Sequence, residues 1–304
     1  MKRVLVLLST YNGEKYLSEQ LDSIITQESV DLTVLVRDDG STDNTPQILD
    51  NYQNKFPDKI IVEFSSNIGC TASFLSLMKL AARKYRDYDY YAFADQDDVW
   101  LPDKLKAAAM SLDSIENNIK LYYCIPKLVN QDLIPLKSVN IQARHTLGET
   151  MILQPCIGCS MVFSKDLLTK ASIIDPLKVD IHDAWTYRVC LALGGKIICD
   201  TTHHILYRQH LSNVIGGSQG FLKKWKRRFK RYFRNNRIRS SQARLILNTY
   251  RHDIPQKELS VLTTVSNYHD SLKKKMDIIL DKNFSSNQPF HNLMFKTAIL
   301  FGKI

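Results

Sequence analysis

Three aspartates stand close together at positions 95, 97 and 98, directly after an apolar run that ends at Ala94. Carboxylates at this spacing repel one another unless a cation lies among them. Hard divalent ions such as Mg²⁺ take oxygen ligands, typically one or two carboxylates together with substrate phosphates. The trio therefore indicates a site for a metal-bound phosphate, with a solvated acidic loop as the alternative. An EF-hand does not fit, because its sixth position requires Gly and this chain has Trp100 there.

The same arrangement recurs along the first hundred residues. Apolar runs at 4–8, 32–36, 60–64 and 90–94 each end in a polar cluster, and helical patterns separate them. Such alternation predicts a mainly parallel sheet with helices on both faces. In open sheets of this class, ligands bind beyond the carboxyl ends of the strands. We therefore expect all four polar clusters to lie at a binding site.

Three stretches of the sequence resemble family 2 glycosyltransferases. They read Val-Leu-Val-Leu-Leu-Ser-Thr-Tyr-Asn-Gly at 4–13, Arg-Asp-Asp-Gly-Ser-Thr-Asp-Asn-Thr at 37–45, and Phe-Ala-Asp-Gln-Asp-Asp-Val-Trp at 93–100. The resemblance is strong over 1–105 and thinner over 150–215. It implies the GT-A fold, an α/β fold with a mixed, mainly parallel sheet and helices on both faces.

The resemblance places a nucleotide sugar at the first three strand ends. Thr10 and Tyr11 would contact it, with Tyr11 stacking on or flanking the base. Asp39 would accept the imide N–H of a uracil or thymine, a bond that a carboxylate makes well. Asn67 lies where the family lines the nucleotide pocket, although an ordinary turn after the third strand would explain it equally.

The resemblance also assigns the carboxylates and a later segment. Asp95 would bind the ribose and Asp97 a Mg²⁺ or Mn²⁺ ion, whereas it defines no role for Asp98. The segment Tyr-Arg-Gln-His-Leu-Ser-Asn at 207–213 resembles the one that closes the catalytic domain. In it, Arg208 would meet a phosphate and His210 would complete the metal's coordination. A structural role for this histidine is the alternative.

Transfer of a sugar with inversion requires a base near the acceptor hydroxyl. The segment Ile-His-Asp-Ala-Trp at 181–185 resembles the His-Asp-x-Trp signature of a rhamnosyltransferase-like branch, which implies that Asp183 is the base. Trp185 would offer an apolar face to the acceptor sugar. Alone, this pattern would indicate a helix start with a core tryptophan. Many members of that branch have an aromatic residue where this chain has Ala184, a difference that points to a different acceptor.

A strongly basic segment follows the catalytic motifs. The formal charge of +10 comes from 41 basic and 31 acidic residues, and residues 221–239 contain ten Lys or Arg and no Asp or Glu. Aromatic and apolar residues recur there at helical spacing. We interpret the segment as a helix on an anionic membrane surface, with Trp225, Phe229, Arg228 and Arg231 among its contacts. One alternative is that the segment packs within the protein or in a dimer. Another is that it binds nucleic acid, but the neutral charge of the rest of the chain argues against this.

These features predict a catalytic domain over 1–215, divided into a nucleotide-sugar half (1–105) and an acceptor half (106–215), and a helical extension over 216–304. The last stretch, 293–304, is hydrophobic enough to dock on the protein, a partner or lipid. We find no signal peptide and no run long enough to span a bilayer. The expected location is the cytoplasm, peripherally on the inner face of a bacterial membrane, and an oligomer remains open.

The expected function is therefore metal-dependent, inverting glycosyl transfer from a dTDP- or UDP-sugar. The branch suggests dTDP-rhamnose as donor and a lipid-linked glycan of a surface polysaccharide as acceptor. A UDP-hexose transferase of the same fold is the nearer alternative. A nucleotidyltransferase would show a Gly-rich basic loop after the first strand, which residues 9–13 lack. A non-catalytic, membrane-bound nucleotide-binding scaffold is argued against by the intact Asp95, Asp97 and Asp183.

Overall fold

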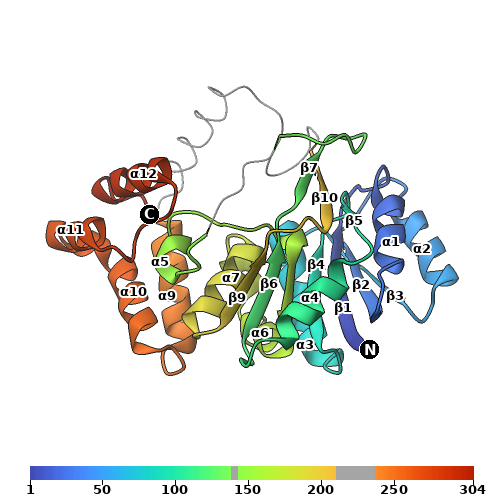
Figure 1. The fold of residues 1–304 in the computed structure, drawn as a ribbon, viewed down its shortest axis with the longest axis horizontal. Helices are drawn as coiled ribbons and strands as arrows, with labels where there is room; N and C mark the ends of the chain where they lie inside the picture. Colours follow the sequence, from blue (N-terminus) through green and yellow to red (C-terminus); the bar gives the residue numbers. More distant parts are fainter. Residues whose placement is uncertain (138–142, 210–236) are drawn as a thin grey trace. The chain divides into compact units, whose positions relative to one another are not determined.

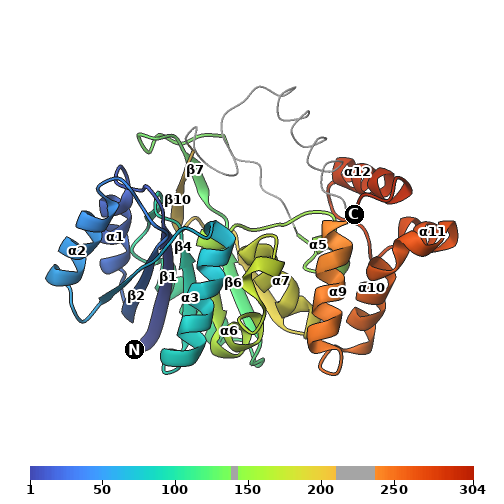
Figure 2. The same cartoon turned by 180° about the vertical axis from the view of Figure 1, so that it is seen from behind.

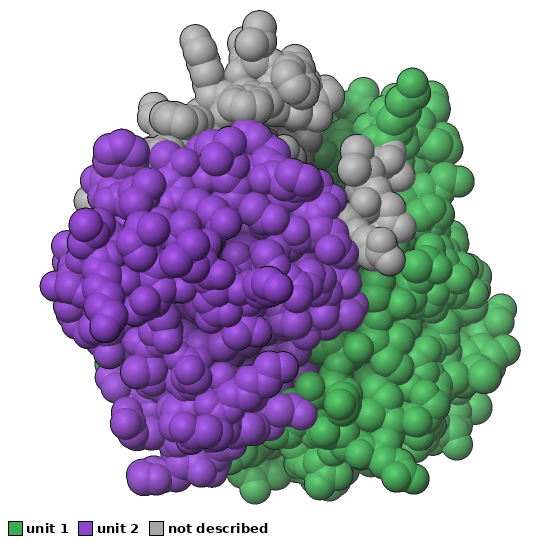
Figure 3. All heavy atoms as spheres, turned by 60° about the vertical axis from the view of Figure 1, so that its left-hand side comes forward, with its two compact units in different colours: residues 1–138, 156–186, 195–210 green, residues 139–155, 187–194, 211–304 purple. Residues whose placement is uncertain are grey.

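The computed structural model describes residues 1–137, 143–209 and 237–304 (Figure 1). The chain forms two compact units (Figure 3). Unit 1 comprises residues 1–138, 156–186 and 195–210, and unit 2 comprises residues 139–155, 187–194 and 211–304. Unit 2 thus includes three segments that the sequence analysis placed in the catalytic domain, namely 139–155, 187–194 and 211–215.

Within the described residues, unit 1 is built on a seven-stranded sheet in the order β3-β2-β1-β4-β8-β6-β9. The strands are β1 (Lys2–Thr10), β2 (Val30–Asp38), β3 (Ile60–Phe64), β4 (Tyr90–Ala94), β6 (Lys120–Cys124), β8 (Met161–Ser164) and β9 (Lys196–Asp200). Strand β8 runs antiparallel to β4 and β6, and the other neighbouring pairs are parallel. The prediction of a mixed, mainly parallel sheet is confirmed.

Helices cover both faces of this sheet, which explains why its central strands read as unbroken apolar runs. Residues Val4 to Leu8 of β1 are fully buried. The helices are α1 (Leu17–Ile25), α2 (Thr45–Lys55), α3 (Cys70–Lys84), α4 (Lys104–Asp113), α6 (Lys165–Ala171) and α7 (His182–Ala192), with 3₁₀ turns η1 (Gly158–Ser160) and η2 (Pro176–Lys178). Figure 1 shows α4 in front of the sheet, and Figure 2 shows α3 in front of the opposite face.

A second, three-stranded sheet stands at the carboxyl end of the large one. It consists of β5 (Val99–Trp100), β10 (Ile205–Arg208) and β7 (Lys127–Val129), with β10 in the middle. Strand β10 pairs antiparallel with β5 through Ile205 and Trp100. Because β5 begins directly after Asp98, this pairing brings Arg208 to the acidic loop.

Unit 2 is helical in its described part. It contains α5 (Leu147–Thr150), α9 (Ile238–Tyr250), α10 (Gln256–Ser266), α11 (Leu272–Leu280), α12 (Pro289–Leu300) and the turn η3 (Tyr268–Asp270). Its buried side chains include Ile246, Leu262, Val265 and Phe295. The predicted helical extension is therefore confirmed over residues 237–304. In the described ranges, no helix has both the length and the apolarity that crossing a bilayer requires.

Candidate active site

The carboxyl ends of β1, β2 and β4 meet at one edge of the sheet, as the sequence predicted. Thr10 lies opposite Asp38 in the register of β1 and β2, and Leu8 lies opposite Ala94 of β4. The Thr10 hydroxyl is buried and donates to the Asp38 carboxylate over 3.0 Å. Asp38 also accepts from the backbone N–H of Ser41 at 2.9 Å. Thr10 therefore ties two strand ends together, and its predicted contact with a nucleotide sugar stays a prediction.

The side chain of Gln96 joins the first polar cluster to the acidic loop. Its Oε1 accepts from the backbone N–H of Tyr11 at 2.8 Å, and its Nε2 donates to the Tyr11 carbonyl at 3.1 Å. The Tyr11 ring is 48% exposed, so it is available to flank a nucleotide base. A Cβ on Gly13 would collide with the Gln96 amide, which explains the glycine at that position. Sequence reasoning missed Gln96, whose signal is its place between two motif aspartates.

Asp39 organises the loop after β3. Its Oδ1 accepts from the N–H of Ile68 at 3.0 Å and its Oδ2 from the N–H of Gly69 at 2.8 Å. The Arg37 guanidinium forms an ion pair with the same carboxylate and donates to the Ser66 carbonyl at 3.0 Å. Asp39 is buried, so an imide N–H would have to share an occupied carboxylate. Its predicted bond to a base therefore stays a prediction.

Asn67 lies in the loop that Asp39 holds, and its side chain is exposed. Its backbone N–H would be 3.1 Å from a Cβ placed on Gly40, where φ is +79°. The loops after β2 and β3 therefore pack closely, which places Asn67 beside the second polar cluster as expected.

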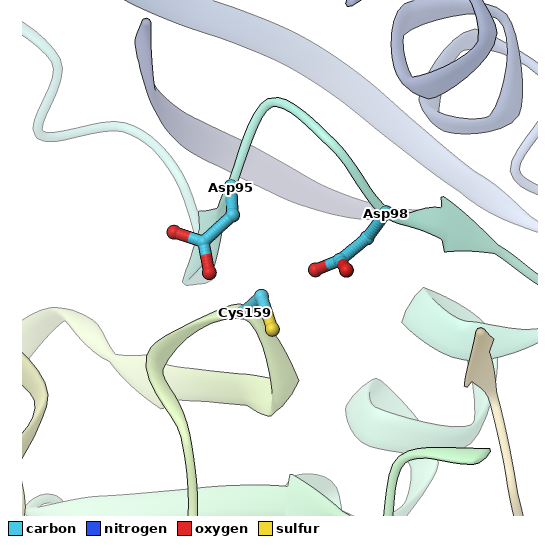
Figure 4. Close-up of side chains that lie close together, drawn as sticks. All are labelled: Asp95, Asp98 and Cys159. Carbon is cyan, nitrogen blue, oxygen red and sulfur yellow. The ribbon is translucent and has the colours of Figure 1, made fainter. Parts of the chain in front are cut away.

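The acidic loop between β4 and β5 gathers negative charge. One carboxylate oxygen each of Asp95 and Asp98 and the Cys159 thiol lie within 4.8 Å of one another (Figure 4). Burial, followed by the charges of Asp97 and Asp183, raises the pKa of Asp95 to about 7. Among the described residues, the buried Oδ2 of Asp98 has no hydrogen-bond partner. Clustered carboxylates that raise one another's pKa, with a buried oxygen to spare, fit a divalent cation.

Cys159 faces this cluster from η1 (Figure 4). Burial raises the pKa of its thiol well above the ordinary value, and the charges of Asp98 and Asp95 raise it further. A protonated thiol is a weak donor rather than a metal ligand. We therefore read Cys159 as a donor to the carboxylates and the aspartates as the oxygen ligands that suit Mg²⁺ or Mn²⁺.

Arg208 braces the acidic loop from β10. Its backbone N–H donates to Asp98 Oδ1 at 3.1 Å, and its Nε donates to the Asp97 carbonyl at 2.9 Å. The remaining guanidinium nitrogens donate to the Gln131 carbonyl and to the Glu19 carboxylate. Arg208 and Glu19 thus form an ion pair. The side chain is buried, so the structure does not support the predicted phosphate contact. The donors are already used within unit 1, and Arg208 instead fixes the loop.

Asp183 stands on the first turn of α7, where the helix dipole favours a carboxylate. Its charge contributes to the raised pKa of Asp95, so the two carboxylates belong to one electrostatic cluster although 88 positions separate them. Its Oδ1 accepts from the N–H of Ala184 at 2.5 Å. The structure thus places Asp183 near Asp95 and Asp97, and the predicted roles of the three as base, ribose ligand and metal ligand stay predictions.

His182 supports Asp183 from within the core. Its ring stacks on Phe74 with centroids 4.0 Å apart and meets the Phe93 ring edge-on at 4.9 Å. Burial lowers the pKa of His182 to about 3, so the ring is neutral at physiological pH. A Cβ on Gly158 would lie 2.7 Å from its Nε2 and 3.5 Å from the Asp183 Cβ. This packing sets the position at which α7 begins.

Trp185 does not present its ring to a ligand. It is fully buried, and its indole N–H donates to the Ala171 carbonyl of α6 at 2.9 Å. The structure therefore does not support the predicted contact with an acceptor sugar. The core tryptophan that the same pattern indicates is what the structure shows.

Lys104, at the start of α4, is a buried cation that sequence reasoning missed. Its Nζ lies 3.3 Å from the centroid of the Trp100 ring and has no hydrogen-bond partner among the described residues. Burial lowers its pKa to about 8, against the opposing influence of Cys124, Cys159 and Asp98. Lys104 thus places positive charge in the core beneath the acidic loop. A lysine at this spacing after the motif gives no sign of burial in the sequence.

Five predicted residues lie outside the described part of the chain. They are His210, Trp225, Arg228, Phe229 and Arg231. Their roles at the metal and at a membrane stay predictions.

The comparisons with known proteins agree with this geometry. The model of the glycosyl transferase family 2 matches residues 5–170, more than half of the chain. The chain belongs to glycosyltransferase family 2. It is 31% identical, over 72% of its length and 77% of the relative, to the dTDP-rhamnosyl transferase RfbG of Shigella flexneri. The resemblance to family 2 and to its rhamnosyltransferase-like members is thereby confirmed, and the chain is a glycosyltransferase.

Solved structures of family 2 enzymes share its fold. The structure of S. aureus TarS 1–349 in complex with UDP-GlcNAc covers 100% of this chain and 82% of that one, with a TM-score of 0.59 at 20% identity. The mannosyltransferase PcManGT from Pyrobaculum calidifontis, in complex with GDP-Man and Mn²⁺, covers 97% of this chain and 73% of that one, with a TM-score of 0.54 at 16% identity. The predicted GT-A fold is confirmed.

Proposed function

We propose that this glycosyltransferase moves L-rhamnose from dTDP-rhamnose to a lipid-linked glycan with inversion, assisted by a divalent metal. The observation that carries the proposal is that Asp183 and the acidic loop approach the same turn η1: a Cβ on Gly158 would lie 3.5 Å from the Asp183 Cβ, and the next residue, Cys159, lies within 4.8 Å of Asp95 and Asp98. Inverting transfer needs a base on one side of the anomeric carbon and charge neutralisation at the leaving diphosphate on the other. These aspartates supply side chains for both.

Asp183 is the proposed base. The acceptor oxygen forms a bond to the anomeric carbon while the bond from that carbon to the diphosphate breaks, and the diphosphate leaves with the electron pair. Asp183 receives the hydroxyl proton. The carboxylate is anchored by the N–H of Ala184 and by the start of α7, which limits its movement toward or away from the hydroxyl.

Asp97 and Asp98 are the proposed ligands of Mg²⁺ or Mn²⁺, with Asp95 directed to the ribose. When bound, the ion stabilises the charge that develops on the diphosphate. The Mn²⁺ and GDP-Man complex of a protein with the same fold supports such a site. Arg208 contributes by holding the carbonyl of Asp97 and the carboxylate of Asp98, so that the loop keeps its shape.

Different observations support the proposed donor and the proposed acceptor. The relative named as a dTDP-rhamnosyl transferase favours rhamnose, whereas the UDP-GlcNAc complex of TarS keeps a UDP-hexose as the second candidate. A lipid-linked acceptor is supported by the basic, aromatic residues at 221–239, which suit the inner face of a bacterial membrane.

Calorimetry tests the proposal directly. Binding of dTDP-rhamnose, UDP-glucose, UDP-galactose and UDP-N-acetylglucosamine is measured with Mn²⁺ and with EDTA. We expect dTDP-rhamnose to bind most tightly and EDTA to weaken that binding. Preference for one UDP-sugar would replace the donor and keep the metal site. Binding that EDTA leaves unchanged would overturn the metal assignment, and no binding at all would overturn the proposed function.

A further inference from the structure

Helix α11 of unit 2 exposes an apolar stripe to solvent. Leu272, Met276 and Leu280 recur every four residues along it, and Leu272 and Leu280 are 70% and 74% exposed. Side chains four apart share a helix face. The opposite side of α11 packs inward through Ile278, which is fully buried. The exposed stripe is therefore separate from the face that holds α11 on the unit.

Helix α12 has the same two-sided character. Met294, Phe295, Ala298 and Ile299 are buried, so the helix docks on unit 2, one of the outcomes expected for residues 293–304. Its other side leaves large apolar groups in solvent: Leu293 is 63% exposed, and Phe301, just beyond the helix, is 67% exposed. Burial of the first face does not account for these side chains.

Lys275 joins the two helices. Its Nζ donates to the Leu300 carbonyl at 2.9 Å, which joins the middle of α11 to the end of α12. Figure 1 shows the two helices side by side in unit 2. Several large exposed apolar side chains on two neighbouring helices are typical of an interaction site.

Cations outnumber anions in this part of unit 2, although Lys274 forms an ion pair with Asp270. Residues 272–304 contain six lysines, at 273, 274, 275, 282, 296 and 303, and two aspartates, at 277 and 281. On a helical wheel, Lys273 and Lys275 flank the Leu272, Met276 and Leu280 stripe on its two sides. Apolar side chains between lysines match a bilayer surface, where the apolar groups enter the boundary region and the cations meet anionic headgroups.

We propose that the paired faces of α11 and α12 form a docking surface for an anionic lipid membrane. Its contacts are Leu272, Met276, Leu280, Leu293, Leu300 and Phe301, with the lysines around them. This inference rests on the proposed lipid-linked acceptor for its biological sense, and it uses residues other than 221–236. A second copy of the chain fits less well, because two such surfaces would bring like charges together.

The test is co-sedimentation of the full-length chain with vesicles of phosphatidylcholine, with or without phosphatidylglycerol. The docking variant carries Leu272→Gln, Leu280→Gln, Leu293→Gln and Phe301→Gln. The control variant carries Met110→Gln, Ile134→Gln, Ile173→Gln and Leu177→Gln, four comparably exposed apolar residues of unit 1. We expect the docking variant to lose at least about tenfold in partitioning to the anionic vesicles, and the control variant to match the unchanged protein.

A direct measurement complements the partitioning. In a Trp225→Phe background, Phe301→Trp places a fluorophore on the docking surface, while Trp100 and Trp185 are buried. Brominated lipids should quench this added tryptophan when anionic vesicles are present. Absence of quenching would overturn the proposal, even if residues 221–236 hold the protein on the vesicles.

Two further outcomes would also reject the surface. Vesicle binding by the docking variant equal to that of the unchanged protein would assign binding to another part of the chain. A docking variant that changes from dimer to monomer in sedimentation equilibrium, with vesicle binding unaltered, would make the face an interface between copies. Donor binding by calorimetry is measured in parallel without lipid, so failure of this surface is distinct from failure of the proposed transfer reaction.

Discussion

The guanidinium of Arg208 donates a hydrogen bond from Nε to the backbone carbonyl of Asp97, 111 positions earlier in the chain. The same arginine donates from its backbone to Asp98 and from its side chain to Glu19 and Gln131. A single buried residue therefore fixes the conformation of the acidic loop.

Replacing this arginine should loosen the loop. We expect Arg208→Met to lower the free energy of unfolding by about 2–4 kcal/mol, because the three part-buried hydrogen bonds of the guanidinium are lost. It should also weaken Mn²⁺-dependent donor binding. Urea denaturation and calorimetry measure the two effects. The control Arg251→Met alters an exposed arginine of unit 2 and should change stability by less than about 0.5 kcal/mol. A normal stability for Arg208→Met would refute the role as a brace.

Asp183→Asn separates binding from transfer. The amide keeps the shape of the side chain but cannot accept the hydroxyl proton, so we expect donor affinity within about twofold and a loss of turnover of about 10²–10⁴-fold. Asp180→Asn is the matched control, since Asp180 is exposed and precedes the helix. Turnover and calorimetric affinity are measured on both. Full activity of Asp183→Asn would remove it as the base.

Gly158→Ala should push against the start of α7. The added methyl would lie 2.7 Å from His182 Nε2, and that ring is held between Phe74 and Phe93. We expect a loss of about 1–3 kcal/mol in stability, with slower transfer because Asp183 shifts. In the double variant with His182→Ala, the ring is gone, and the cost of Gly158→Ala should largely disappear. Additive costs in the denaturation data would contradict this contact.

The pH dependence of the stability of Lys104→Met tests whether the buried lysine carries a charge. Burial lowers the pKa of Lys104 to about 8 in the folded chain, from the model-peptide value of 10.5. The unfolded state therefore binds more protons between these values, and the stability of the unchanged protein rises with pH across that range. Below pH 8 the full cost of the buried charge is present. We expect Lys104→Met to be more stable by about 1–3 kcal/mol at pH 7, a gain that fades toward pH 10.5.

Denaturation at several pH values measures this gain. Lys106→Met is the matched control, because Lys106 is exposed two residues later on the same helix. It should show no such dependence on pH. A stabilisation by Lys104→Met that is the same at pH 7 and pH 10.5 would show that packing, rather than charge, accounts for the difference.

The sequence located the strand ends well because local patterns determine them. The predicted runs 60–64 and 90–94 match β3 and β4, and 4–8 and 32–36 lie inside β1 and β2. Parallel strands then place their ends at one edge, so the meeting of Thr10, Asp39 and Asp95 followed from the fold class. The assignment of Asp183 to the same site came from the resemblance of residues 181–185 to the rhamnosyltransferase-like signature.

Side-chain directions followed less well, because they depend on partners far along the chain. Arg208 is used by Glu19, Gln131 and the acidic loop, and Trp185 packs against α6. Neither set of contacts can be predicted from the sequence around Arg208 or Trp185. The burial of Lys104 is equally invisible, since a lysine at a helix start ordinarily lies in water.

The side-chain amide of Gln96 makes the same pair of hydrogen bonds to the Tyr11 backbone that a neighbouring β-strand would make. Its Oε1 accepts from the Tyr11 N–H, and its Nε2 donates to the Tyr11 carbonyl. Carboxylates and apolar groups lack that pair of functions, and a hydroxyl carries both on a single oxygen rather than on two separate atoms. In a library built to change the sugar that this enzyme transfers, position 96 should be kept as Gln. Diversity is better introduced at exposed loop positions such as Ser66 and Asn67, where new side chains change the surface beside Asp39 and leave the contacts between Gln96 and Tyr11 in place.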